Sequence, residues 1–196
     1  IKAGAKKNKI VYLPNGIPGE FFKQKKSREN KNKILFLGRI SPKKKLDSLV
    51  LAIPYLKNKK SFIEIVGPEE KEHSSHIKNL IKKVKVSDRV IFTKPIYNLK
   101  DKIKKLDSAK VFVLPSRVEG MPQSLIEAMA RGKIVIGSNS IAIRDIIKDE
   151  QNGYLFQFNN PKDLAKKIEV ALKNNKQNRL ISKNVRNFAK QFSWEN

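Results

Sequence analysis

Cysteine is absent from this chain of 196 residues, so disulfides and sites built on a thiolate are excluded. No apolar run approaches the roughly 20 residues of a membrane-spanning helix. Nine glycines and nine prolines are too scattered to form a linker, and no segment of the sequence repeats. Because a chain of this length buries roughly 70% of its unfolded surface, we expect one well-filled domain.

Acidic residues are scarce. The 18 aspartates and glutamates stand against 43 lysines and arginines, which gives a formal net charge of +25. Such a balance favours nucleic acid or an anionic membrane as a partner. Only eight of the basic residues are arginine, the side chain best suited to reading base edges, and the lysines are spread over the whole chain. We therefore interpret most of the charge as a solvated lysine-rich surface. The alternative is a basic nucleic-acid-binding α/β domain, whose binding would weaken steeply with salt.

Short β-branched runs alternate with longer amphipathic stretches along the chain. The runs predict strands, and apolar residues at spacings of three and four predict helices. The expected strands cover residues 33–37, 62–66, 89–92, 111–115, 133–136 and 153–156, and the expected helices cover 46–53, 77–84, 99–106, 123–130, 161–172 and 179–190.

This alternation of strands and helices indicates βαβ units and an α/β fold. We expect a Rossmann-like, doubly wound parallel sheet of about six strands with helices on both faces. Several expected strands end in glycine or proline followed by polar residues. Open sheets of this kind bind small molecules outside the carboxyl ends of their strands, so we expect a ligand crevice at that edge.

The segment after the fourth expected strand, residues 114–132, is the most informative. Gly120 allows a ligand to approach the backbone closely, and Pro122 suits the first position of the next helix. Free N–H groups at a helix start favour an anion. The groups expected to face the crevice are those of Met121, Gln123 and Ser124.

Two carboxylates, Glu119 and Glu127, flank the start of the same expected helix. Carboxylate oxygens accept hydrogen bonds from adjacent hydroxyls of a sugar or ribose. Equally, Glu119 could cap the helix while Glu127 lies on its solvated face. The residues alone leave both interpretations open.

A second segment, residues 38–45, reads GRISPKKK and follows the first expected strand. An arginine and a lysine facing one crevice supply two cations for a diphosphate, with each charge-assisted bond contributing roughly 1.5–3 kcal/mol. Neither G-x-G-x-x-G nor a Walker pattern occurs, so the ordinary dinucleotide and P-loop interpretations lack support. The lysine triplet by itself is also typical of a solvated turn.

His73 and His76 form an H-x-x-H pair in a charged stretch. No third ligand is evident near them in the sequence. We expect a solvated pair and predict no metal site.

Together these segments resemble the donor-binding half of a GT-B glycosyltransferase, in the large group called family 4 or glycosyl transferases group 1. Its E-x7-E motif corresponds to Glu119 and Glu127 within PSRVEGMPQSLIEAMARGKIVIGSN. The other similar stretches are, in chain order, IVYLPNGIPGEFF, ILFLGRISPKKK, IRDIIKDEQNGYLF and FSWE. The resemblance extends from about residue 9 to residue 195.

The resemblance implies retaining transfer of a sugar from a nucleoside-diphosphate sugar to an acceptor such as a glycan or a lipid-linked saccharide, with no metal or other cofactor. Arg39 and Lys44 would bind the diphosphate and stabilise the leaving charge, and Glu119 would hold the transferred sugar; these are the expected catalytic residues. Glu127 would hold the ribose, and the backbone of residues 94–96 would receive the base. The expected donor-binding residues are Gly38, Gly120, Met121, Pro122, Gln123, Ser124, Leu125, Glu127, Lys94, Pro95 and Ile96.

Three departures from the family pattern affect these expectations. Lys45 stands where glycine is common, which would alter the turn that carries Lys44. Residues 140–145 replace a usual Gly-Gly-x-x-Glu, so that loop's ligand contact is in question. Lys94 and Pro95 stand where a glycine is frequent, which leaves the base site open.

The family pairs this kind of domain with an N-terminal Rossmann-like half that binds the acceptor. Residues 1–16 resemble the connection between the halves with a first short strand, and residues 17–196 resemble the nucleotide-sugar-binding domain. We therefore expect a donor domain without its acceptor domain, either separated from a longer chain or one subunit of a split enzyme, and inactive alone.

The resemblance also implies a cytoplasmic protein. Contact of its basic surface with anionic lipid at the inner face of a membrane is a further hypothesis. A relative that does not transfer sugar to an acceptor, such as a nucleotide-sugar epimerase, and a regulatory half that senses nucleotide sugar remain alternatives.

Overall fold

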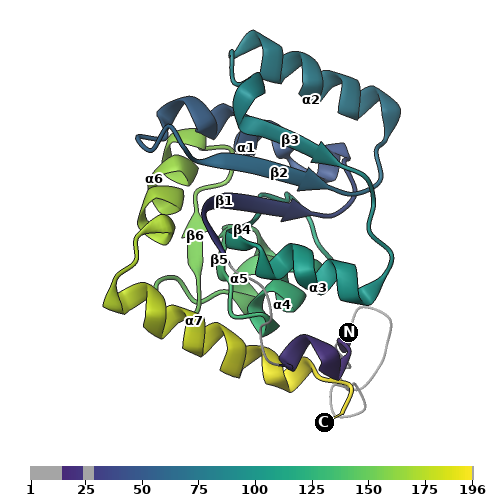
Figure 1. Cartoon of the computed structure of the whole chain (residues 1–196), viewed down its shortest axis with the longest axis vertical. Coiled ribbons are helices and arrows are strands. Elements are labelled where there is room, and N and C mark those ends of the chain that lie inside the picture. Colours follow the sequence, from purple (N-terminus) through teal and green to yellow (C-terminus); the bar gives the residue numbers. More distant parts are fainter. Residues whose placement is uncertain (1–14, 24–28, 196) are drawn as a thin grey trace, which may run out of the picture.

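A six-stranded parallel sheet forms the centre of the molecule in the computed structural model, which describes residues 15–23 and 29–195 (Figure 1). The strand order is β3-β2-β1-β4-β5-β6, and every neighbouring pair is parallel. The chain moves outward from β1 to β3, returns to the centre at β4 and then moves outward to β6. This arrangement confirms the expected doubly wound, Rossmann-like sheet.

The strands lie close to their expected positions because each contains a short apolar run. The runs of the central strands are buried on both faces, whereas β3 at the edge of the sheet is only partly buried. Two shifts are clear: β1 begins at Asn30, three residues before its expected start, and Arg89 belongs to a 3₁₀ turn before the third strand. The strands are β1 (Asn30–Leu37), β2 (Phe62–Val66), β3 (Val90–Thr93), β4 (Ala109–Leu114), β5 (Ile134–Ser138) and β6 (Tyr154–Phe156).

Six of the α-helices were expected, and the last of them begins at Lys176, three residues before its expected start. The second begins at Lys71, six residues before the expected start, because its first turns are largely charged and carry no apolar repeat. Helix α5 was not expected, since six residues are too short for a helical period to be visible. The helices are α1 (Leu46–Ala52), α2 (Lys71–Lys83), α3 (Leu99–Asp107), α4 (Gln123–Ala130), α5 (Ile141–Ile146), α6 (Pro161–Leu172) and α7 (Lys176–Ala189).

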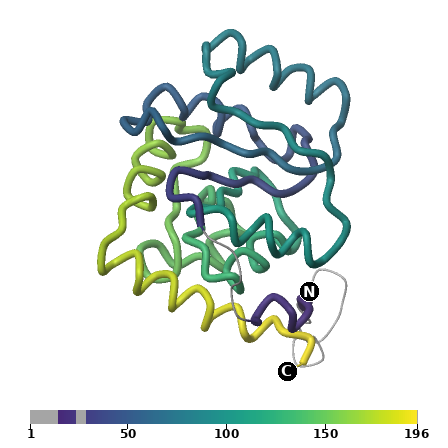
Figure 2. The backbone as a smooth tube through the Cα atoms, in the orientation of Figure 1, coloured from purple at the N-terminus to yellow at the C-terminus, as the bar shows by residue number. Residues whose placement is uncertain are grey.

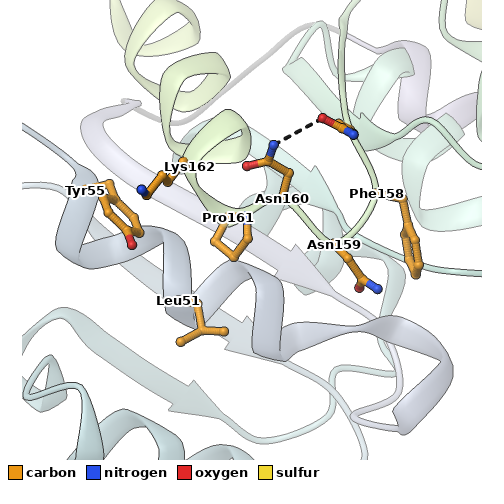
Figure 3. Close-up of a pocket in the computed structure, with 8 residues that line it drawn as sticks. Leu51, Tyr55, Phe158, Asn159, Asn160, Pro161 and Lys162 are labelled. Carbon is orange, nitrogen blue, oxygen red and sulfur yellow. Dashed lines mark hydrogen bonds between the residues drawn. The ribbon is translucent and has the colours of Figure 1, made fainter.

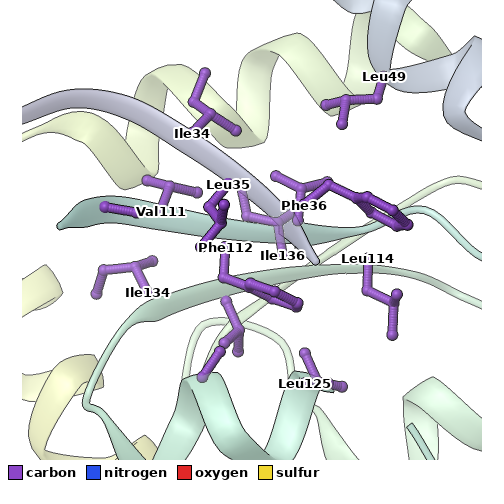
Figure 4. Close-up of a cluster of buried hydrophobic side chains, with 14 of the residues drawn as sticks. Ile34, Leu35, Phe36, Leu49, Val111, Phe112, Leu114, Leu125, Ile134 and Ile136 are labelled. Carbon is purple, nitrogen blue, oxygen red and sulfur yellow. The ribbon is translucent and has the colours of Figure 1, made fainter. Parts of the chain in front are cut away.

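Helices cover both faces of the sheet. Helix α1 packs against α2 and α6, whereas α4 packs against α7 on the opposite face. Buried side chains of β1, β4 and β5 form the centre of the core between these layers (Figure 4). Phe36 and Phe112 are fully buried there, and burying a side chain of this size contributes about 1.5–3 kcal/mol.

The first and last described segments lie side by side, as the tube in Figure 2 shows. Ile17 forms a parallel bridge with Ser193; its N–H donates to the carbonyl of Phe192 at 2.7 Å, and its own carbonyl accepts from Trp194 at 3.1 Å. The expectation of an interdomain connection in residues 1–16 falls mostly outside the described residues. Within the described part of the chain, no helix has the length and apolar character needed to cross a bilayer.

Candidate functional site

Two neighbouring loops meet where β1 and β4 end, at the point where the strand order reverses. One loop runs from Gly38 through the 3₁₀ turn η3 (Pro42–Lys44), and the other covers residues 115–120. The backbone N–H of Arg117 donates to the carbonyl of Lys43 at 2.9 Å and joins them. This reversal point is where open α/β sheets bind ligands, and the structure has a pocket there.

This pocket has a volume of about 610 Å³, and we call it the Arg39 pocket. It brings together Arg39, Lys44, Glu119 and Gly120, which the sequence had placed in two separate segments. The other lining residues are Ser41, Pro42, Lys43, Glu70 and Val118.

Lys44 and Glu119 form an ion pair across the Arg39 pocket. Nζ of Lys44 lies 2.6 Å from Oε1 of Glu119, and the side chains are 22% and 9% exposed. The alternative in which Glu119 caps α4 is therefore wrong, because no side chain caps that helix. Arg39 is exposed, and its guanidinium has no hydrogen bond or ion pair with any described residue. Of the three cationic side chains that line the pocket, Lys44 is held by a carboxylate, whereas those of Arg39 and Lys43 have no bond to a described residue.

Glycines bring the loop of Arg39 close to the sheet. Gly67, at the end of β2, has a φ of +149°, and a Cβ there would collide with the carbonyl oxygen of Gly38. Only glycine allows this approach. The N–H of Gly38 donates to the carbonyl of Val66 at 2.9 Å, which fixes where the loop begins. Gly67 is a positioning residue that the sequence marked only as a strand end.

Gly120 lines the Arg39 pocket for a different reason. A Cβ at this position would meet nothing within 4 Å, and its φ lies outside the range that disfavours other residues. Neither packing nor backbone conformation therefore requires glycine here. Because Gly120 has no side chain, the wall of the pocket beside Glu119 is backbone alone, which a ligand can approach closely.

The start of α4 differs from expectation in two details. Pro122 precedes the helix instead of occupying its first position. The N–H of Gln123, expected to be free for an anion, donates to the carbonyl of Met121 at 2.9 Å. Pro122 and Leu125 are buried, and their side chains pack into the protein, whereas Ser124 is half-buried and Gln123 exposed. None of residues 121–125 lines the Arg39 pocket, and they supply fewer free donors than the sequence suggested.

Glu127 lies one turn into α4, where it is buried with only 7% of its surface exposed. The alternative that placed it on a solvated face is wrong. Burial raises the pKa of this carboxyl, and the ammonium of Lys102, 2.9 Å from Oε1, partly opposes that shift. A carboxylate with one oxygen held by a lysine has the other available to accept hydrogen bonds.

Lys102 was missed by the sequence reasoning. It lies on α3, three residues before Lys105, whose ammonium binds the buried carboxylate of Glu64 at 2.6 Å. Helix α3 thus contributes two lysines that each neutralise a buried acid. The amphipathic pattern of the helix was visible in the sequence, but the acids that its lysines meet come from other elements.

The loop after β3 holds the residues expected to receive the base. Lys94 is exposed, and Pro95 and Ile96 are half-buried. None of the three lines the Arg39 pocket. The assignment of the base to this loop stays a prediction.

The turn that carries Lys44 forms although glycine is replaced by Lys45. Lys45 adopts the left-handed conformation, with φ 51° and ψ 43°, which is the conformation that glycine favours. The substitution therefore leaves the turn in place at a cost in backbone strain.

The histidine pair lies on α2, with the two rings stacked 5.9 Å apart. Among residues 15–23 and 29–195, no group of three side chains suitable for holding a metal ion is present. His76 is exposed, whereas His73 is half-buried, and burial lowers the pKa of its ring.

Comparison with known proteins places this geometry in a family. Residues 19–188 match the family described as glycosyl transferases group 1. An uncharacterized glycosyltransferase of Methanocaldococcus jannaschii is 28% identical over 96% of this chain and 51% of its own length. The enzyme of Campylobacter jejuni named GalNAc-α-(1→4)-GalNAc-α-(1→3)-diNAcBac-PP-undecaprenol α-1,4-N-acetyl-D-galactosaminyltransferase is 31% identical over 85% of this chain and 45% of its own length.

The fold agrees with these matches. The crystal structure of Anabaena HepE in complex with UDP and glucose superposes with a TM-score of 0.86 at 18% identity, over 98% of this chain and 55% of that one. The chain spans about half the length of the curated relatives it matches. On the strength of the match over residues 19–188, the chain belongs to the glycosyl transferases group 1 family.

Proposed function

We propose that this chain is the nucleotide-sugar-binding domain of a retaining glycosyltransferase. The observation that carries the proposal is the Arg39 pocket, in which Arg39, Lys44, Glu119 and Gly120 converge at the reversal point of the sheet. Two cations suit a diphosphate, and a carboxylate beside bare backbone suits the hydroxyls of a sugar. Family membership adds the reaction class.

In the proposed reaction, the bond between the anomeric carbon and the diphosphate oxygen breaks, and its electron pair goes to the diphosphate. An acceptor hydroxyl forms the new bond from the same face, and its proton passes to the leaving phosphate oxygen. Arg39 and Lys44 stabilise the charge that grows on that oxygen, so the proposal needs no metal. Glu119 orients the sugar, and Glu127 holds the ribose.

The Lys44–Glu119 pair connects the binding of the diphosphate with the binding of the sugar. An ammonium has three donors, so Lys44 can bind a phosphate oxygen while it remains 2.6 Å from Glu119. The lysine would then set the spacing between the diphosphate and the carboxylate that holds the sugar. We further propose that the domain transfers sugar only together with an acceptor-binding half.

The names of the relatives suggest first ligands for a test. HepE was solved with UDP and glucose, and the Campylobacter enzyme is named for a saccharide linked to undecaprenol through a diphosphate. UDP is therefore the first nucleotide to test, and a lipid-linked saccharide is the proposed acceptor class. The excess of lysine fits a protein that works beside anionic lipid, which liposome co-sedimentation with and without anionic lipid would test; equal pelleting rejects it.

Thermal unfolding with UDP, GDP, ADP and their sugars tests the donor site. A ligand at about 100 times its Kd adds about 2.7 kcal/mol, which shifts Tm by about 5–10 °C for a domain of this size. Arg39→Ala removes charge-assisted bonds and should weaken binding about 10- to 100-fold. Arg179→Ala, an exposed arginine of α7, is the matched control and should bind normally. A chain that no nucleotide stabilises would contradict the proposal.

A further inference from the structure

A second pocket adjoins the Arg39 pocket and has no role in donor binding as described above. Its volume is about 540 Å³, and we call it the Arg117 pocket. Val118 and Glu119 line both pockets, so the two are neighbours separated by these side chains. The remaining lining residues are Arg117, Asn139, Ser140, Ile141, Ala142, Arg144 and Phe158. Four of them, Ser140, Ile141, Ala142 and Arg144, belong to residues 140–145, the segment that departs from the family pattern.

Two arginines supply the charge of the Arg117 pocket. Arg117 and Arg144 are both exposed, and neither guanidinium has a hydrogen bond or ion pair with a described residue. Glu119 is the one carboxylate that lines the pocket, and Lys44 already neutralises it at 2.6 Å. The charge left over is therefore positive. Guanidinium groups match the oxygens of phosphates and carboxylates with two parallel hydrogen bonds, so two arginines on one pocket suit a phosphate or diphosphate.

Apolar side chains surround these cations. Ile141 is 73% exposed and Val118 is 62% exposed, while Phe158 is half-buried between this pocket and a further pocket around Tyr55 (Figure 3). An exposed isoleucine and valine beside unpaired arginines give one surface both anion-binding and hydrocarbon-binding character. A ligand that satisfies both features is an amphiphilic phosphate.

We propose that the Arg117 pocket binds the phosphate or diphosphate group of an amphiphilic acceptor, whose hydrocarbon part packs on Val118, Ile141 and Phe158. The inference rests on the proposed function and adds to it a site on this domain for the acceptor. Because Glu119 lies in the wall between the pockets, an acceptor anchored by Arg117 and Arg144 would lie beside the sugar that Glu119 holds. The domain would then contribute to acceptor recognition as well as to donor binding.

Binding of farnesyl diphosphate, below its micelle concentration, tests the site by calorimetry. The nucleoside diphosphate that stabilises the chain most is added at saturation so that the Arg39 pocket is occupied. We expect binding under these conditions, and a loss of about 100-fold in the Arg117→Ala/Arg144→Ala double variant, since each charge-assisted contact is worth about tenfold. The control double variant Arg179→Ala/Lys183→Ala, which removes two exposed basic side chains of α7, should bind as the parent does.

Two further measurements distinguish the hydrocarbon-binding part of the site from its anion-binding part. Ile141→Ser should weaken farnesyl diphosphate several-fold and leave inorganic pyrophosphate unchanged, because it removes hydrocarbon contact alone. Pyrophosphate that binds as tightly as farnesyl diphosphate would overturn the apolar half of the proposal. If the Arg117→Ala/Arg144→Ala variant binds farnesyl diphosphate as well as the control double variant does, the proposed site is wrong.

The test also distinguishes this inference from the proposed function. If no nucleotide binds, the same titrations in the Arg39→Ala background still report on the Arg117 pocket, and only the proposed function fails. If nucleotides bind and farnesyl diphosphate does not, the donor assignment stands and the acceptor site is wrong.

Discussion

Basic residues have opposite roles at the two ends of the parallel strands. At the end of the sheet where strands begin, which we call the amino edge, Arg89, Arg131 and Lys133 are buried, and each side chain donates at least three hydrogen bonds. Arg131 makes a two-pronged ion pair with Asp107 at 2.9 and 2.8 Å and also donates to the carbonyls of Phe21 and Lys23. Arg89 donates to three backbone carbonyls, at 2.8, 3.2 and 3.1 Å.

At the carboxyl edge, where strands end, the arginines have no such partners. Arg39, Arg117 and Arg144 line pockets and make no side-chain bond to a described residue. A buried cation needs complete satisfaction because desolvation is costly, whereas an exposed cation keeps its water and remains available to an anion. The comparison therefore separates arginines that hold the fold from arginines available to a ligand, although all of them contribute equally to the net charge.

The largest expected effect comes from the amino edge. Arg131→Met leaves Asp107 buried without its partner and should lower the free energy of unfolding by about 3–5 kcal/mol, measured by urea denaturation. Arg39→Met at the carboxyl edge should change it by less than about 0.5 kcal/mol. Equal losses in the two variants would erase the distinction between the edges.

Lys102 tests whether a paired cation near the carboxyl edge still serves a ligand. Lys102→Met removes the ammonium from buried Glu127, which favours its protonated form and should weaken nucleotide binding about tenfold, or about 1.4 kcal/mol. Lys104→Met, on the same helix and 75% exposed, is the control. Calorimetric titration with the best nucleotide measures both. Identical affinities would make the Lys102–Glu127 pair purely structural.

Two buried carboxylates, Glu64 and Glu127, should contribute to stability with opposite dependence on pH. Burial by itself would raise the pKa of Glu64, but hydrogen bonds from Lys105, Lys33 and Thr93 outweigh it and lower that pKa. Its stabilising contribution is therefore present above the unfolded pKa of 4.5 and is lost as the pH falls. Glu127 has a raised pKa, so its contribution is present below 4.5 and is lost as the pH rises through the folded value.

Urea denaturation between about pH 2.5 and 7 distinguishes the two carboxylates. The loss caused by Glu64→Gln should grow as the pH rises, and the loss caused by Glu127→Gln should shrink, by about 1.4 kcal/mol for each unit of pKa difference. Parallel pH profiles for the two variants would show that Lys102 satisfies Glu127 as completely as the three donors satisfy Glu64.

The smallest effect concerns backbone strain at one position on each edge. Lys45 and Lys85 both have a left-handed backbone, with φ of 51° and 56°. Replacing either by glycine relieves about 1–2 kcal/mol of strain and loses about 0.5–1 kcal/mol to chain entropy, so each variant should be more stable by up to about 1 kcal/mol. Thermal unfolding measures this gain. Only Lys45→Gly, next to Lys44, should alter nucleotide affinity; a change with Lys85→Gly would argue against a local effect.

The fold was predictable because its signals are local. Short apolar runs such as residues 33–37 and 62–66 each predict a strand without reference to the rest of the chain. Their alternation with helices predicts a parallel sheet. The Arg39 pocket was predictable in outline because both of its loops follow strands directly. The partners of its side chains were not, since the Lys44–Glu119 and Lys102–Glu127 contacts join residues 75 and 25 positions apart.

Errors at the start of α4 have the same origin. Pro122 is common at a first helical position, but here the chain makes a tight turn before it, and Gln123 bonds to Met121. The burial of Glu127 depends on how α3 and α4 pack, which no local pattern contains. Gly67 shows the same limit, because glycine is required there by the carbonyl of Gly38, which follows a different strand.

The hydrogen bond from the N–H of Arg117 to the carbonyl of Lys43 has a consequence for how this site can evolve. It joins the two loops of the Arg39 pocket through main-chain atoms alone, so it is indifferent to which side chains stand at positions 43 and 117. Both positions line a pocket, and mutation can therefore sample new ligand preferences there without separating the loops. Proline at position 117 is the exception, since it alone lacks the N–H on which this tolerance depends.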